Sequence, residues 1–162
     1  MSQFEFGYTL EKEALNLFCS HENRIHLGIN QKNKQVDLLV DRMEQLEHFL
    51  SIVAAKTDDS GRLDLTNAED QALVDKIRGY EELGEHVFPH GKYVWKEKEI
   101  EDLTRRVENY IQGSLQRKIS ITSEEIVLDQ HDLNKTLEIF KGCITRMNNL
   151  IERILGNIQR GH

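Results

Sequence analysis

Residues 56–67 have part of the spacing of a calcium-binding loop. With Gly61 as the glycine of the sharp turn, Asp58 and Ser60 fall at positions that supply oxygen ligands. The first and last ligand positions of the loop do not have the residues that calcium needs. Lys56 occupies the first position, and Asn67 occupies the position of the bidentate glutamate. The sequence therefore predicts a polar turn without calcium.

Histidine and cysteine do not occur at the spacings of metal sites. His86 and His90 are four residues apart, but Pro89 between them prevents one helical face from presenting both. Cys19 and Cys143 are too few for a disulfide framework, and no Cys-x-x-Cys occurs. We predict no metal ligand, and we expect Cys143, beside an apolar stripe, to be a buried free thiol in a reducing compartment.

Motifs of catalysis are also missing from the sequence. No serine lies in a nucleophile elbow, and neither a phosphate-binding loop nor a dinucleotide-binding fingerprint occurs. A di-iron helical bundle would need Glu-x-x-His motifs, and the chain has none. We therefore predict a protein that is not an enzyme, with no catalytic residue and no cofactor.

Composition narrows the choice of partners. The 162 residues carry 28 acidic and 21 basic side chains, and this net charge of -7 argues against nucleic acid as a partner. No run of apolar residues is long enough for membrane insertion. The first residues include Glu5, Glu11 and Lys12 where a secretory signal would be apolar. We expect a cytoplasmic protein.

The C-terminal segment has the clearest helical period. From Leu133, alternate steps of four and three residues meet only apolar side chains, which is the seam of a coiled coil. A capping box at residues 122–125 predicts where this helix starts, giving a helix over about 123–159. The seam residues are Leu133, Leu137, Phe140, Ile144, Met147, Ile151, Ile154 and Ile158.

The N-terminal segment repeats this period from Phe18 to Val53, where nine of eleven stripe positions are apolar. With Thr9 as N-cap, it predicts a helix over about 10–55. The poor helix formers between Ser20 and Gln35 leave open a break into two helices.

Two shorter helices are predicted over about 67–83 and 93–119, between loops at 56–66 and 84–92, and no strand is predicted. The predicted fold is all-α. Residues 1–162 would form a single helical domain, an elongated antiparallel bundle of about four helices, long-short-medium-long, with coiled-coil packing.

Charge is unevenly distributed within the middle of the chain, with a net charge of -6 over residues 57–91 and +2 over residues 92–122. Two packed neighbouring segments would explain this distribution. The alternative is an acidic face for a basic partner.

Large apolar side chains mark two candidate partner-binding regions. One region, around Phe88, Tyr93 and Trp95, has two interpretations: its rings could plug the end of the bundle, or they could form an exposed hydrophobic tip. The other region is the half of the long first helix that the short second helix cannot cover. Its candidate residues are Phe4, Phe6, Tyr8, Leu15, Phe18, Ile25 and Ile29.

These features favour a non-catalytic module for protein–protein interaction, such as an adaptor, a chaperone-like protein or a component of a secretion apparatus. Its partner would be a second copy or another helical protein, and self-association is the leading expectation. The alternative is a helical bundle that binds a small molecule or a metal.

Overall fold

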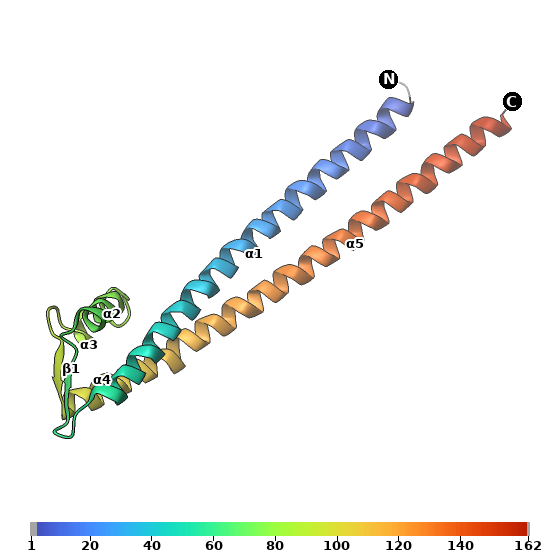
Figure 1. Ribbon diagram of the computed structural model, residues 1–162. Coiled ribbons are helices and arrows are strands. Elements are labelled where there is room, and N and C mark those ends of the chain that lie inside the picture. Colours follow the sequence, from blue (N-terminus) through green and yellow to red (C-terminus); the bar gives the residue numbers. More distant parts are fainter. Residues whose placement is uncertain (1–2, 162) are drawn as a thin grey trace. The chain divides into compact units, whose positions relative to one another are not determined.

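The computed structural model describes residues 3–161, apart from the side chains of Gln3, Phe4 and Phe6. Helix accounts for 83% of the chain, far above the roughly one third of an average soluble domain, and this confirms the all-α class. The predicted order of helix lengths is also confirmed (Figure 1). The elements are α1 (Gln3–Lys56), β1 (Arg62–Asp64), α2 (Ala68–Arg78), α3 (Gly84–Val87), β2 (Val94–Lys96), α4 (Glu97–Tyr110), the π-helical turn η1 (Ile111–Leu115) and α5 (Gln116–Arg160).

The chain forms two compact units. One, the two-helix unit, spans Met1–Asn33 and Glu124–His162 and therefore contains the first part of α1 and most of α5. The other, the central unit, spans Lys34–Ser123 and contains every other element.

Helix α1 is uninterrupted, so the break that was left open between Ser20 and Gln35 does not occur. Packing outweighs the weak helix propensity of this stretch, because Ile25 is half-buried and Ile29 is buried. The helix also starts before the predicted cap. Thr9 lies inside it, and the Thr9 hydroxyl donates to the carbonyl oxygen of residue 5 at 2.8 Å.

The core of the central unit is built around aromatic side chains. The ring of Phe88 meets Phe49 edge-on at 5.2 Å and Trp95 at 6.5 Å between ring centroids. Aliphatic side chains from α1, β1, α2, α4 and η1 complete this core. Its most deeply buried members are Leu46, Phe49, Leu63, Leu65, Val74, Ile77, Phe88, Val107 and Leu115.

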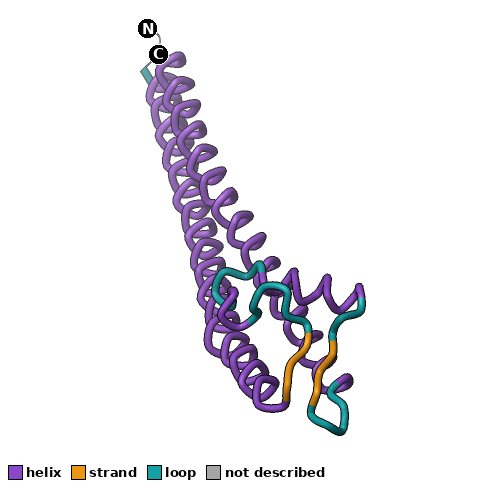
Figure 2. Tube along the Cα trace, turned by 90° about the vertical axis from the view of Figure 1, so that its left-hand side faces the viewer, coloured by secondary structure: helices purple, strands orange, loops and turns teal. Residues whose placement is uncertain are grey.

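Two short strands, which the sequence did not predict, lie side by side in the central unit (Figure 2). β1 and β2 are antiparallel, and Leu63 pairs with Trp95 so that both side chains enter the core. Residues Val94 and Trp95 suit a strand better than the first turn of a helix. The predicted third helix therefore starts at Glu97 instead of residue 93.

The second predicted helix is shorter than expected. Helix α2 ends at Arg78 instead of residue 83, and a further single turn, α3, lies inside the predicted loop 84–92. The N-cap is Asn67, whose side-chain oxygen accepts hydrogen bonds from the amides of Glu69 and Asp70 at 2.8 and 3.1 Å. The helix therefore starts at Ala68, one residue after the predicted start.

The predicted break at residues 120–122 is wrong, because α4, η1 and α5 follow one another without a loop. Thr122, the predicted cap, is buried inside α5. A π turn, instead of a break, keeps the apolar side chains before and after it on one side of the helix. Val107, Ile111, Leu115 and Ile119 recur every four residues, a spacing that drifts around an α-helix of 3.6 residues per turn. The extra residue of a π turn absorbs this drift.

Candidate interaction face

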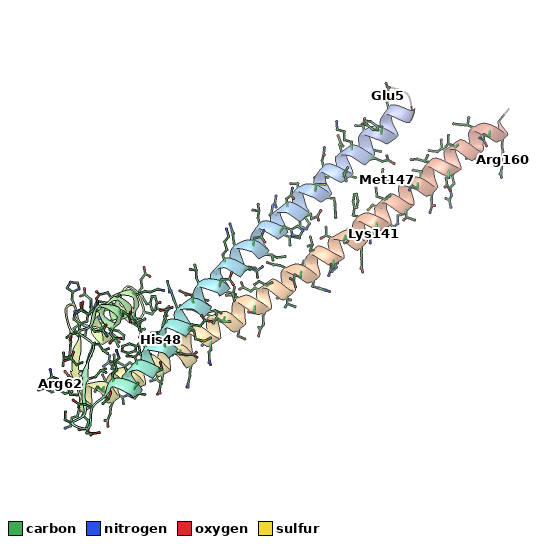
Figure 3. The ribbon with its side chains drawn as sticks, in the orientation of Figure 1. Glu5, His48, Arg62, Lys141, Met147 and Arg160 are labelled. Carbon is green, nitrogen blue, oxygen red and sulfur yellow. The ribbon has the colours of Figure 1, made fainter. Side chains whose placement is uncertain are left out.

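The two helical segments of the two-helix unit run antiparallel. Phe18 of α1 stacks on Phe140 of α5 with ring centroids 4.2 Å apart, and Lys32, later in α1, contacts Asp129, earlier in α5. In this unit Glu5, near the start of α1, and Arg160, at the end of α5, lie at the same end (Figure 3).

An ion pair lies in the seam between the two helices. Lys32 Nζ is 2.7 Å from Asp129 Oδ2 and 3.7 Å from Glu125 Oε2. The hydrogen bond to Asp129 is the main reason that the pKa of Lys32 is raised. A polar contact in an apolar seam favours one register over others, because other registers leave the polar group unpaired.

Apolar side chains are abundant in the two-helix unit, and few of them are buried. Among the described residues, fourteen of the sixteen exposed large apolar side chains belong to this unit. Of the twenty buried apolar residues, only Ile29 and Ile126 do. Two helices that cover only one stripe of each other leave the remaining apolar surface in water.

One side of the helix pair is rich in exposed apolar side chains. Leu15 lies three residues before Phe18, and Leu137 lies three residues before Phe140, so each side chain falls about 60° from the direction of the partner helix. Repeats of seven residues extend this side from Leu137 to Ile158 on α5 and back to Tyr8 on α1, where Glu22 ends the repeat in the other direction. We define the interaction face as Tyr8, Leu15, Leu137, Ile144, Ile151 and Ile158.

Both helices line one groove near the end of the two-helix unit. Tyr8 of α1 and Ile151 and Ile158 of α5 line a single groove with a volume of about 240 Å³. Gly7 contributes no side chain to this groove, and Ile154 and Leu155 complete its apolar wall. The only charged residue in its lining is Glu11.

The opposite side of the pair is less suited to apolar packing. Leu17 and Ile139 each lie one residue before a stacked phenylalanine, which places them about 100° away on the other side. At seven-residue intervals, Ile139 is followed by Arg146, Arg153 and Arg160. On this side α5 therefore presents three arginines as well as the apolar Ile139.

The N-terminal candidate residues belong to two different environments. Tyr8 and Leu15 are exposed on the interaction face, whereas Phe18 and Ile25 are half-buried in the seam and Ile29 is buried. The side chains of the remaining two candidates, Phe4 and Phe6, lie outside the described residues.

The aromatic segment is part of the core and does not form an exposed tip. Phe88 and Trp95 are almost inaccessible to solvent, so of the two interpretations the core one is correct. Tyr93 is half-buried. Its hydroxyl donates to Asp75 Oδ1 at 2.9 Å, and the guanidinium carbon of Arg78 lies 5.5 Å from the centroid of its ring. These contacts fix the 86–95 segment against α2 within the central unit.

Sequence reasoning missed the half of the interaction face that α5 supplies. Ile144 and Ile151 were expected in a buried seam, but Ile144 is half-buried and Ile151 is 37% exposed. The signal was the width of the stripe: Leu150 and Leu155 extend it beyond what one partner helix covers.

Other expectations for reactive side chains also differ from the structure. Cys143 is exposed, as is Cys19, so the prediction of a buried thiol is wrong. The reason is that residue 143 lies on the flank of the seam, three residues after Phe140. Within residues 3–161, no three His, Cys, Asp or Glu side chains come together as a metal site would need. No helix in the same range has the length and apolar character to cross a membrane.

No protein-family model matches the chain, and no curated protein or solved structure shows significant similarity to it.

Proposed function

We propose that this protein is a non-catalytic interaction module that docks another helical chain onto the interaction face by coiled-coil packing. The observation that carries the proposal is the contrast within the two-helix unit, whose described residues include fourteen exposed large apolar side chains and only two buried apolar ones. A helical partner is favoured because apolar positions recur every seven residues from Leu137 to Ile158 on α5 and at Tyr8 and Leu15 on α1, a repeat that suits the side chains of a third helix.

The energy available from such docking is substantial. Each large apolar side chain that becomes fully buried contributes roughly 1.5–3 kcal/mol before the cost of association. The interaction face offers six of these, four of them on α5. A cytoplasmic location is part of this proposal, since two exposed free cysteines suit a reducing compartment.

Affinity capture from the native cell, with quantitative mass spectrometry, tests the proposal. The face variant combines Leu15→Glu with Ile151→Glu, which places two charges where a partner would pack. The matched control combines Leu17→Glu with Ile139→Glu, which adds the same charges to exposed apolar positions on the other side. We expect the unsubstituted protein and the control to retain the same partner, whether a helical protein or an untagged second copy, and the face variant to lose it. Equal capture by all three would contradict the proposal.

A further inference from the structure

The arginines of the two-helix unit have no partner within the described part of the chain. Of the six arginines in the central unit, four form ion pairs with carboxylates. The four arginines of the two-helix unit are all exposed, and none has an ion pair or a hydrogen bond with a residue in the range 3–161. Each guanidinium therefore keeps its charge and its five N–H donors for contacts outside the chain. These residues are Arg24, Arg146, Arg153 and Arg160.

Three of these arginines form a row on the side of α5 that faces away from the interaction face. They recur every seven residues, so successive members lie about 10.5 Å apart along the helix. We define the basic face as Arg146, Arg153 and Arg160. No acidic residue flanks this row: the neighbouring positions are Cys143, Leu150 and Asn157 toward the seam and Gly142, Asn149 and Gly156 on the outer side.

A shallow hollow of about 550 Å³ lies between two arginines of the basic face. It is open because Gly156 has no side chain, and no atom lies within 4 Å of the place where a side chain of this residue would begin. The guanidiniums and amides around it are donors that suit a carboxylate. The other lining residues are Asn149, Arg153, Asn157 and Arg160, with Glu152 as the one acidic member.

We propose that the basic face docks an acidic helix whose Asp or Glu side chains recur every seven residues. The sign of the charge requires an anionic partner, and the equal spacing lets one helix place a carboxylate at every arginine in a single register. Lipid headgroups carry the same charge but have no fixed interval, so the regular spacing favours a helix. Leu150, which is 59% exposed between Arg146 and Arg153, adds an apolar contact. This docking is separate from the interaction face and goes beyond the proposed function.

Fluorescence anisotropy with a defined acidic helix tests the proposal. The acidic probe is a labelled peptide, rich in Ala and Gln, of about four heptads with Glu at every seventh position. The shuffled probe has the same composition, with its Glu residues on different faces. We expect the full chain to bind the acidic probe at least about fivefold more tightly than the shuffled one, and more weakly as NaCl is raised.

Two triple variants with the same loss of charge locate the binding. Arg146→Gln/Arg153→Gln/Arg160→Gln should raise the Kd for the acidic probe by about tenfold or more, because three ion pairs are lost. The control is Lys34→Gln/Lys98→Gln/Arg117→Gln, at exposed positions of the central unit that have no ion pair with a described residue. It should leave the Kd within about threefold, and circular dichroism should show both variants equally helical.

Three outcomes would overturn the proposal. One is no binding of the acidic probe at high micromolar concentration, and another is an equal effect of the two triple variants. The third is equal binding of the two probes, or binding through the three arginines only to vesicles that contain phosphatidylserine, because the regular spacing would then play no part.

The basic face and the interaction face can be tested separately. Leu15→Glu/Ile151→Glu should leave the Kd for the acidic probe within about threefold, whereas Leu17→Glu/Ile139→Glu, which adds carboxylates on the side of the basic face, should raise it. Failure of the probe to bind would overturn this docking alone. Loss of face-dependent capture would overturn the proposed function and leave this docking intact.

Discussion

Phe18 and Phe140 stack with their ring planes only 18° from parallel, and they are the one pair of aromatic rings in contact among the described residues of the two-helix unit. Stacked rings contribute roughly 0.5–1.5 kcal/mol beyond the area they bury. This contact links residues on α1 and α5 that are far apart in the sequence, and it lies midway along the seam.

A double-mutant cycle measures this contact. Phe18→Leu and Phe140→Leu should each lower the protection of nearby amides from hydrogen exchange, and the double variant should lose less than the sum of the two, by about 0.5–1.5 kcal/mol. Amides of the central unit serve as the internal control and should keep their protection. Additive losses would mean that the rings are not coupled.

Removal of Phe88 tests the core assignment. Phe88→Ala leaves a large cavity between Phe49 and Trp95 and should cost about 3–5 kcal/mol of unfolding free energy. His86→Ala, two residues earlier at an exposed position, should change it by about 0.5 kcal/mol or less. Urea melts of both variants compare them directly. A mild effect of Phe88→Ala would mean that the ring is not packed as described.

Deletion of single residues tests the π turn. Without Gln112, the helix should become a regular α-helix, and the stripe before and after η1 would still face one side. Without Glu47, an exposed residue of α1, Leu39 would rotate about 100° away from Phe49. We expect a cooperative thermal transition for the Gln112 deletion and its loss for the Glu47 deletion. Equal tolerance of the two deletions would contradict the role of the π turn.

Glu82 should make stability depend on pH on the acid side. The hydrogen bond from Lys118, and then that from Ser114, lower the pKa of Glu82. Because its pKa is lower in the folded chain, the stabilisation is present above the ordinary glutamate pKa and is lost as the pH falls through the folded value. Glu82→Gln should therefore destabilise the protein at neutral pH and make the urea midpoint fall less steeply below about pH 4.5.

The control for this pH series is Glu81→Gln. Glu81 is exposed and has no hydrogen bond or ion pair with any described residue, so this substitution should leave the acid limb of the curve unchanged. If both variants gave the parent's curve, the Glu82 contacts would contribute nothing to stability in solution.

Calcium should not stabilise the protein. In the 58–62 turn, Asp58 Oδ1 already accepts hydrogen bonds from the amide and hydroxyl of Ser60, at 3.0 and 2.6 Å, and from the amide of Arg62 at 2.8 Å. We expect millimolar calcium added to chelator-treated protein to leave the melting temperature unchanged, since an ion that binds the native state would raise it. A reproducible rise of several degrees would show that the turn is a calcium site.

The parts of the fold that could be predicted from the sequence are those that repeat. The stripes around Phe18 and Phe140 extend over many turns, so the two long helices followed from their period. The β1–β2 pair could not be predicted, because three residues such as Val94–Lys96 carry too little pattern and depend on a partner some 30 residues away.

For the candidate site, periodicity identified apolar positions and could not say how many neighbours cover each one. Leu15 and Ile25 look alike in the sequence, yet one is 48% exposed and the other is half-buried against α5. Burial depends on the number of helices around each stripe, which is a property of the assembled chain. The α5 half of the interaction face was therefore taken for a buried seam.

The antiparallel pairing of α1 with α5 has a consequence for synthesis on the ribosome. Lys32 and Asp129 are 97 residues apart, so the pairing surface of α1 emerges long before its partner exists. Residues 34–123, which form the central unit, emerge in between and can fold first, and this removes most of the chain freedom that the pairing would otherwise have to lose. Until α5 has been made, the apolar stripe from Tyr8 to Ile29 lacks the helix that it packs against in the complete chain.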